Sequence, residues 1–375
     1  MSINTASSIY AMDEAERHVF FYEKADWRFD ILGESKWSVN SSVRWRTDLS
    51  DALKQRGDFR IYNTYIQYKN RDFIGRLGRQ FLFDGAAGLT LDGISISAGD
   101  DFGAGIFAGI ESPYDRSAEL SDYQPSATFG GRLSYRRRGL LYKISYVSVG
   151  SGDREGYQLL GLHSSQKLRI LPVSISLRVD YNISKSHLQK GVIRLKGRLS
   201  RLEYNLSVCK RLPLIRQDSW FSSFDLKGYT QVRAALDYTF TEGWNIGAAA
   251  METISEEDLI SYLEVFISGE KGLLGYRFRT GGHSSLNGFY FDLNHPMSDK
   301  VDINLGFNYD RYNNYDAEYG SEALSAVFAA RYQWRDWCIL KGELQSLSND
   351  YFESDWRIML TALTSFKTGR ARGMK

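Results

Sequence analysis

The dominant pattern along the chain is a two-residue alternation of apolar and polar side chains. Residues 173–182, Val-Ser-Ile-Ser-Leu-Arg-Val-Asp-Tyr-Asn, show it plainly, and it returns almost to the end of the chain. Successive side chains of a β-strand point to opposite faces, so this pattern predicts strands with one apolar and one wet face. Such strands separate two solvents. The pattern therefore favours a transmembrane antiparallel β-barrel with lipid outside and water inside.

The alternation divides the chain into segments separated by turn residues. We expect about 22 strands, within a range of roughly 20–24, because segment boundaries are the weakest part of such an assignment. The first two segments are residues 17–24 and 26–34, and the barrel as a whole occupies residues 17–367. The fold class is all-β, an up-and-down barrel whose even strand number brings both of its ends to the periplasmic side.

The two ends of the chain are assigned separately. We expect residues 1–16 to be an N-terminal arm or the residual end of a signal peptide, because residues 6–11, Ala-Ser-Ser-Ile-Tyr-Ala, resemble a cleavage region. Residues 368–375 form a basic C-terminal tail. In the last strand before it, one face carries Trp356, Ile358, Leu360, Ala362 and Phe366, as in barrels whose final strand ends on an aromatic residue.

Two classes of connector alternate along the chain. Short polar connectors such as Arg138-Gly139 have the residues of tight turns, and we assign them to the periplasmic side. The longer connectors, at 49–58, 112–126, 212–228 and 313–322, then face the outside. The longest contains Trp220, Phe221 and Phe224, which either fold inward or pack on one another. We find neither an N-terminal plug domain nor a long inward-folding loop.

Composition agrees with a water-filled barrel. The 375 residues are 14% aromatic and 25% charged, with a mean hydropathy of −0.37 and a formal net charge of +2. No run of about 18 apolar residues occurs, so no transmembrane helix is expected. The nearly neutral charge gives no reason to expect a nucleic-acid partner. Cys209 and Cys338 lack any C-x-x-C spacing and are expected to be isolated thiols.

The polar phase of the strands supplies candidate lumen residues. Arg194-Leu-Lys196-Gly-Arg198 places three cations at every second position of one strand, and Arg178 lies on the strand before it. A charged ladder of this kind holds an anion loosely at several positions and lets it move on. The alternative is interior charge balance, with arginines paired to carboxylates on neighbouring strands. The candidate pore-lining residues are Arg76, Arg132, Arg178, Arg194, Lys196, Arg198, Arg233, Arg277, Arg279 and Arg331.

Residues 59–93 carry a family resemblance. A tyrosine-bearing strand leads into Gly75-Arg76-Leu77-Gly78-Arg79-Gln80-Phe81, and Leu91-Asp92-Gly93 follows. This hairpin resembles that of the alginate-export-type porins of the bacterial outer membrane. The resemblance implies that Arg76, Arg79 and Gln80 lie on or beside the pore wall, and that the solutes are anionic sugars such as polyuronates. The external connectors of this chain are shorter than those of that family.

The function expected from these features is passive diffusion of small hydrophilic solutes, favouring anions or anionic sugars, across the outer membrane of a Gram-negative bacterium. The partners are then outer-membrane lipid and the solutes. The alternative is a structural sleeve around a barrel-inserted or periplasmic partner protein, such as the porin component that surrounds a multihaem cytochrome in an electron conduit.

An enzymatic function finds no support in the sequence. The possible catalytic bases lack the spacing of a nucleophile elbow or an H-E-x-x-H motif. His283, in Gly-Gly-His-Ser-Ser, lies next to serines but in a predicted loop. We therefore expect no reaction, no cofactor and no metal site. The histidines are His18, His163, His187, His283 and His295.

Overall fold

The protein folds into 22 β-strands. The computed structural model describes the chain except for residues 14–16, 32–35, 51–57, 85, 113–125, 151–155, 169–171, 213–226, 283, 315–319, 350–351 and 368–375. The strands are β1 (Ser2–Asp13), β2 (Arg17–Ile31), β3 (Trp37–Asp48), β4 (Asp58–Lys69), β5 (Phe73–Asp84), β6 (Ala87–Ala98), β7 (Phe102–Glu111), β8 (Ala127–Arg137), β9 (Leu140–Val149), β10 (Tyr157–Lys167), β11 (Val173–Asn182), β12 (His187–Leu199), β13 (Leu202–Arg211), β14 (Tyr229–Thr241), β15 (Trp244–Ile254), β16 (Leu259–Gly269), β17 (Gly272–Gly281), β18 (Ser284–Ser298), β19 (Val301–Asn314), β20 (Gly320–Arg335), β21 (Cys338–Asn349) and β22 (Phe352–Lys367).

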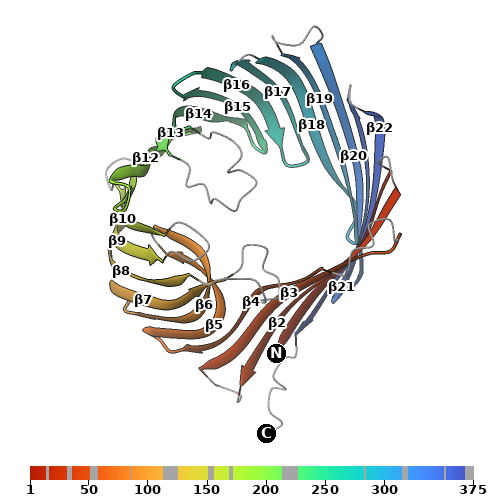
Figure 1. Cartoon of the computed structure of the whole chain (residues 1–375). Coiled ribbons are helices and arrows are strands. Elements are labelled where there is room, and N and C mark those ends of the chain that lie inside the picture. Colours follow the sequence, from red (N-terminus) through yellow and green to blue (C-terminus); the bar gives the residue numbers. More distant parts are fainter. Residues whose placement is uncertain are drawn as a thin grey trace.

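All strands belong to one antiparallel sheet that closes on itself (Figure 1). Each strand pairs with its neighbours in sequence, and β1 pairs with β22 from Ser2↔Lys367 to Met12↔Arg357. The predicted fold class and the predicted strand number are confirmed. Within the described residues no helix is long and apolar enough to cross a membrane.

The N-terminal strands differ from the prediction. Residues 2–13, expected to be part of an arm, form β1, and the two segments predicted at 17–24 and 26–34 are the single strand β2. The alternation in β1 is weak because Thr5 and Ser7 occupy the outward positions between Ile3 and Ile9. In β2, Ala25 lies between Lys24 and Asp26 and interrupts the apolar phase. The two errors cancel, so the total is still 22.

One face of the wall carries a belt of exposed apolar side chains. Leu77 is 60% exposed, Ile106 64% and Leu133 65%, although all three lie within strands. A soluble protein would bury such side chains, whereas the outer surface of a membrane barrel leaves them in contact with lipid. The apolar phase therefore identifies the outer face, and the polar phase identifies the inner one.

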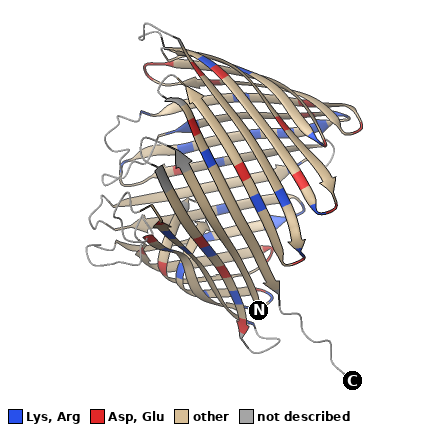
Figure 2. Cartoon of the chain, turned by 90° about the vertical axis from the view of Figure 1, so that its right-hand side faces the viewer, with Lys and Arg blue, Asp and Glu red and all other residues tan. Residues whose placement is uncertain are grey.

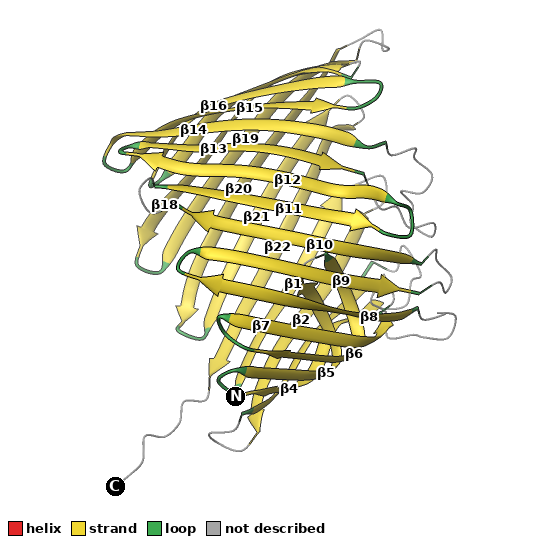
Figure 3. Ribbon diagram, turned by 90° about the vertical axis from the view of Figure 1, so that its left-hand side faces the viewer, coloured by secondary structure: helices red, strands yellow, loops and turns green. Residues whose placement is uncertain are grey.

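The fully described turns of two or three residues lie at the end of the barrel where β1 begins and β22 ends, and the turns at 183–186 and 255–258 lie at the other end (Figure 3). In the turn between β8 and β9, Arg138 has a φ of 48° and Gly139 a φ of 85°. Two consecutive residues with positive φ form the two-residue hairpin turn whose twist matches that of the strands. This turn joins neighbouring strands without disturbing their register.

The far end of the β5–β6 hairpin leaves the wall. The β4–β5 ladder stops at Thr64↔Arg79, and the β6–β7 ladder stops at Leu91↔Glu111. Beyond these points the only further backbone–backbone hydrogen bond to a neighbour among the described residues runs from Ser112 N–H to Thr90 O at 2.9 Å, and β5 and β6 otherwise pair with each other up to Asp84↔Ala87. We call residues 80–91, apart from residue 85, the hairpin tip. In Figure 1 the ends of β5 and β6 curl into the ring of strands, beside β8–β10.

The hairpin tip packs on the inner wall through a small apolar core. Leu82, Leu89 and Leu91 from the tip are buried, and Leu91 is fully inaccessible to solvent. Their partners in the wall are Phe107, Val147, Val149 and Leu159. The backbone N–H of Ala86 also donates a 2.9 Å hydrogen bond to Ser145 Oγ on β9. The tip is thus anchored inside the barrel by both apolar burial and a hydrogen bond.

Glycines permit the bend that brings the tip inward. Gly78 and Gly93 are cross-strand partners at the base of the tip, and Gly78 has a φ of +121°. A Cβ atom on Gly93 would lie 2.2 Å from the carbonyl oxygen of Ala108 and 2.7 Å from the Cα atom of Gly109 on β7. These distances allow only a hydrogen atom, so the close approach of β6 and β7 requires glycine at this position.

We predict that Gly93→Ala destabilises the barrel. The added methyl group collides with backbone atoms, and overpacking of this kind costs about 1–3 kcal/mol. Urea unfolding in detergent micelles, followed by tryptophan fluorescence, should show a lower midpoint for this variant. Gly342→Ala is the matched control, because a Cβ there lies 3.6 Å from its nearest neighbour, Leu360 Cδ2. Equal midpoints for the two variants would contradict the prediction.

Candidate pore-lining site

The strand register assigns a face to each predicted lumen cation. Arg178 is the cross-strand partner of His163 and Val192, and Arg194 is that of Ser176 and Ser207. Because cross-strand partners share a face, all ten predicted residues lie on the face opposite the exposed apolar belt. The hairpin tip contacts this same face from within the ring of strands, at Ser145. The face that carries the ten cations is therefore the inner one.

Four of these ten cations form ion pairs with carboxylates. Their partners lie on the same strand or on an adjacent strand, except that the Arg277–Asp310 pair reaches across β18. The pairs are Arg178 Nε with Asp180 Oδ2 at 2.9 Å, Arg198 with Glu203 at 3.5 Å, Arg277 Nε with Asp310 Oδ1 at 2.9 Å, and Arg331 with Asp302 at 2.8 Å. Charge balance thus accounts for part of the set.

Other cations of the set have neutral neighbours. Arg76 Nε donates to Gln67 Oε1 at 3.0 Å, and its guanidinium carbon lies 5.4 Å from the ring centre of Tyr65. Arg279 donates to Ser284 Oγ at 2.7 Å. Arg132 lies on β8 opposite Gly105 and Ser145. Arg194, Lys196 and Arg233 form no ion pair with any residue that the structure describes.

Positive charge is concentrated on one side of the barrel. Strands β8 to β12 contain a single acidic residue, Asp180. We call the inward cations of these five strands the basic sector; they are Arg132, Arg136, Lys143, Lys167, Arg178, Lys190, Arg194, Lys196 and Arg198. On the opposite side of the barrel acidic and basic positions are interleaved along the strands (Figure 2). The inner wall is therefore electrostatically asymmetric.

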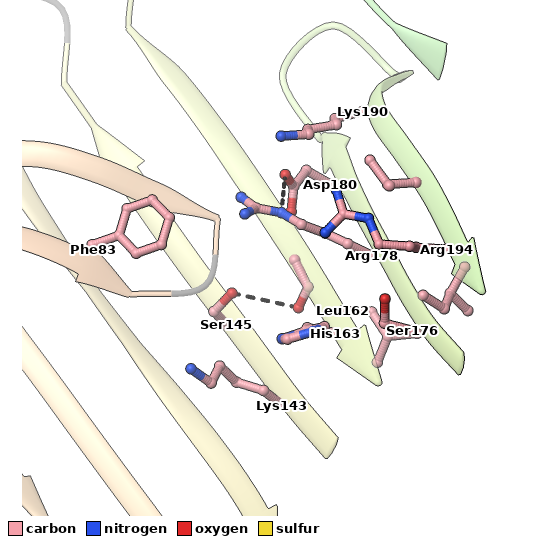
Figure 4. A pocket seen from close by; sticks show the side chains of 13 residues that line it. Phe83, Lys143, Ser145, Leu162, His163, Ser176, Arg178, Asp180, Lys190 and Arg194 are labelled. Carbon is pink, nitrogen blue, oxygen red and sulfur yellow. Dashed lines mark hydrogen bonds and ion pairs between the residues drawn. The ribbon is translucent and has the colours of Figure 1, made fainter. Parts of the chain in front are cut away.

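A hollow of about 320 Å³ lies between the hairpin tip and the basic sector. Phe83 from the tip lines one side of this hollow, and Lys143, Arg178, Lys190 and Arg194 line the other (Figure 4). These cations come from three strands, β9, β11 and β12, and His163 on β10 completes the wall. We call this space the tip hollow.

Sequence reasoning missed Phe83 and Lys190 as members of this site. Phe83 belongs to the apolar phase of β5, which faces outward wherever β5 remains in the wall. The tip turns this phase toward the lumen, and Phe83 is 74% exposed there. The only sequence signal for this reversal is the paired glycines, Gly78 and Gly93, at the base of the hairpin.

The structure corrects the position implied for Arg79. Arg76 and Gln80 lie on the inner phase of β5, but Arg79 belongs to the opposite phase together with Leu77. Its Nε and Nη2 atoms each donate to the carboxylate of Asp92 at 2.7 Å. Its Nη1 also donates to the carbonyl oxygen of Ile61, 3.4 Å away, where β5 separates from β4. Arg79 supports the bend and does not belong to the inner wall.

The remaining predictions from the sequence concern residues of two connectors, the two cysteines and a possible metal site. Trp220, Phe221, Phe224 and His283 lie outside the described residues. Cys209 and Cys338 are both free thiols, and Cys338 is buried. Among the described residues, no three His, Cys, Asp or Glu side chains are grouped so that they could hold a metal ion.

Comparison with known proteins supports the fold. No protein-family model matches the chain, and no curated protein matches its sequence. The translocation pore of the P pilus usher PapC is similar in structure, with a TM-score of 0.54 and 8% identity over 98% of this chain and all of that one. The siderophore receptor PirA from Pseudomonas aeruginosa gives a TM-score of 0.57 and 10% identity over 97% of this chain and 80% of that one. At these identities the similarity establishes an outer-membrane type of β-barrel, and the alginate-export-type family is not confirmed.

We predict that Gly161→Val displaces the hairpin tip. A Cβ atom at Gly161 would lie 2.6 Å from Ser145 Oγ and 2.9 Å from the Cβ atom of Ala86. With Ala86→Cys in a background lacking Cys209 and Cys338, a bulky maleimide should label the tip roughly tenfold faster once Gly161→Val is added, because overpacking opposes docking.

The control for this labelling experiment is Gly306→Val. Gly306 also faces inward, but a Cβ there has Val327 Cβ as its nearest neighbour, at 3.6 Å. Labelling should keep its original rate in this control. A Gly161→Val variant that is labelled no faster than its parent would show that the tip is not docked at Ser145 and Gly161.

Proposed function

We propose that the protein is a passive channel in the outer membrane of a Gram-negative bacterium, and that it conducts small hydrophilic solutes with a preference for anions. The observation that carries this proposal is the basic sector. Five neighbouring strands present nine cations to the lumen against one carboxylate, and that carboxylate, Asp180, is held by Arg178.

The placement of the charges suits conduction better than tight binding. Arg194 and Lys196 are exposed, and the Arg198 side chain is 61% exposed, so water screens their interaction with any passing anion. Along β12 they occupy alternate positions, which are separated by about 7 Å in a strand. An anion can therefore exchange one cation for the next without leaving the positive region, as conduction requires.

The basic sector also sets the direction of selectivity. Clustered charges of one sign beside a low-dielectric wall raise the local concentration of counter-ions and lower that of ions with the same sign. Anions are enriched along β8–β12, and cations are depleted there. Anionic sugars, which the resemblance in residues 59–93 implies, are one class of solute with suitable charge and polarity for this path.

We predict that replacing Arg194, Lys196 and Arg198 together by Ser shifts the reversal potential toward cation permeability. The variant lacks three of the nine charges of the basic sector, so anion enrichment falls. The measurement is the reversal potential in planar bilayers under a salt gradient. Unchanged selectivity would reject these three residues as the filter.

A charge-matched variant separates local from global effects. Arg71, Lys271 and Lys300 are exposed cations in the turns β4–β5, β16–β17 and β18–β19. Replacing these three by Ser changes the net charge equally but leaves the inner wall intact, so the reversal potential should stay near that of the unaltered protein. Absence of any conductance, together with copurification of a multihaem protein, would instead favour the sleeve.

A further inference from the structure

We infer that the tip hollow is a binding subsite for small anions that carry at least two negative charges on an aromatic ring. This inference rests on the proposed function, because it describes a stopping place within the same lumen. It depends on three features of the hollow: its excess positive charge, the exposed ring of Phe83 and the anchoring of the hairpin tip.

The charge of the hollow calls for a polyvalent anion. Among the lining cations, Arg178 is paired with Asp180, whereas Lys190 and Arg194 form no ion pair with any residue that the structure describes, so two positive charges are left for a ligand. Asp180 accepts from Arg178 Nε at 2.9 Å, and its side chain is only 7% exposed, so it has little surface for a cationic ligand. Carboxylates and similar oxyanions are the natural partners of the remaining cations.

Phe83 supplies the apolar part of the site. Its side chain is 74% exposed and lines the hollow opposite the cations (Figure 4). A phenyl ring exposed to water gains free energy when another ring covers it, and aromatic pairs gain beyond the area that they bury. A ligand ring that contacts Phe83 can direct its anionic groups toward Lys190 and Arg194 on the facing wall.

The hairpin tip fixes the position of Phe83. Leu82, its chain neighbour, is buried in the small apolar core. Leu82 pairs across the hairpin with Leu89 on β6, which is buried in the same core. The N–H of Ala86 bonds to Ser145 on the wall that also bears Lys143. The distance between the ring and the cations is therefore set before any ligand arrives, which lowers the entropic cost of binding.

Size and openness agree with a small ligand that is held briefly. The volume of about 320 Å³ lies at the lower end of the range for small-molecule sites, about 300–1,000 Å³. The cations Arg194 and Lys190 remain partly exposed, so water competes for them. These properties suit a subsite that a solute occupies during passage and then leaves.

The test compares two dianions by calorimetry with the whole protein in detergent micelles. Isophthalate carries two carboxylates on a benzene ring, and glutarate carries two carboxylates on a flexible aliphatic chain. We expect isophthalate to bind about fivefold more tightly, in line with the contribution of one aromatic pair. Phe83→Ala should abolish this difference, and Lys190→Gln should weaken both ligands about threefold, as for a partly exposed ion pair.

Lys341→Gln is the matched control for the charge. Lys341 lies on the inner face, opposite Arg331 and Thr361, far along the wall from the hollow. Binding of both ligands should be unchanged in this variant. Equal affinity for isophthalate and glutarate, an unaltered preference in Phe83→Ala, or no heat from either ligand at millimolar concentration would each overturn the inference.

The calorimetric result is independent of conduction. If the protein bound isophthalate through Phe83 and Lys190 but passed no current in bilayers, the result would support the binding subsite and reject the channel function. If the protein passed an anion-selective current but bound isophthalate no more tightly than glutarate, the result would support the channel function and reject the binding subsite.

Discussion

Closure of the backbone hydrogen-bond ladder is the constraint on which the rest of this structure depends. In an apolar surrounding, an unpaired N–H or C=O has no water to bond, so a spanning sheet must have no free edge. The β1–β22 pairing removes that edge over eleven residue pairs. Hydroxyl contacts between Thr5 and Thr364 at 2.7 Å, and between Ser8 and Thr361 at 2.9 Å, reinforce the same seam. The exception is the place where β5 separates from β4, and there the guanidinium of Arg79 bonds to the exposed Ile61 carbonyl.

Much of the fold and of the inner wall was predictable because the side-chain period of a strand is two residues. That period assigns Arg194, Lys196 and Arg198 to one face once any residue of β12 is placed. It does not determine where a strand leaves its neighbour. The alternation of β5 is interrupted by Arg79, which occupies the apolar phase, and the pairing of β5 with β4 ends at this same residue. Phe83 therefore belongs to the phase that faces outward inside the wall, but beyond the bend it lines the tip hollow.

The charges on the inner wall combine two roles that seemed to be alternatives. Arg277, Arg331 and Arg198 lie beside carboxylates, and such pairs make a crowded wall compatible with its own charge. The basic sector differs because its strands carry no carboxylate except Asp180. Arginines and carboxylates thus lie close together on other parts of the inner wall. The basic sector, in contrast, is a stripe of the inner wall with an excess of positive charge. The hairpin tip lies over that stripe, so the part of the lumen that the tip occupies adjoins a positive part of the wall.

The separate ladder of the hairpin tip has a consequence for how pore calibre can vary. Residues 82–84 and 87–89 pair only with each other, so lengthening or shortening both strands by two residues keeps every other register in the cylinder unchanged. Elsewhere in the wall an insertion would have to be accommodated by two neighbouring strands. Related chains could therefore widen or narrow their lumen by shortening or lengthening the hairpin tip, while the surrounding cylinder stays the same.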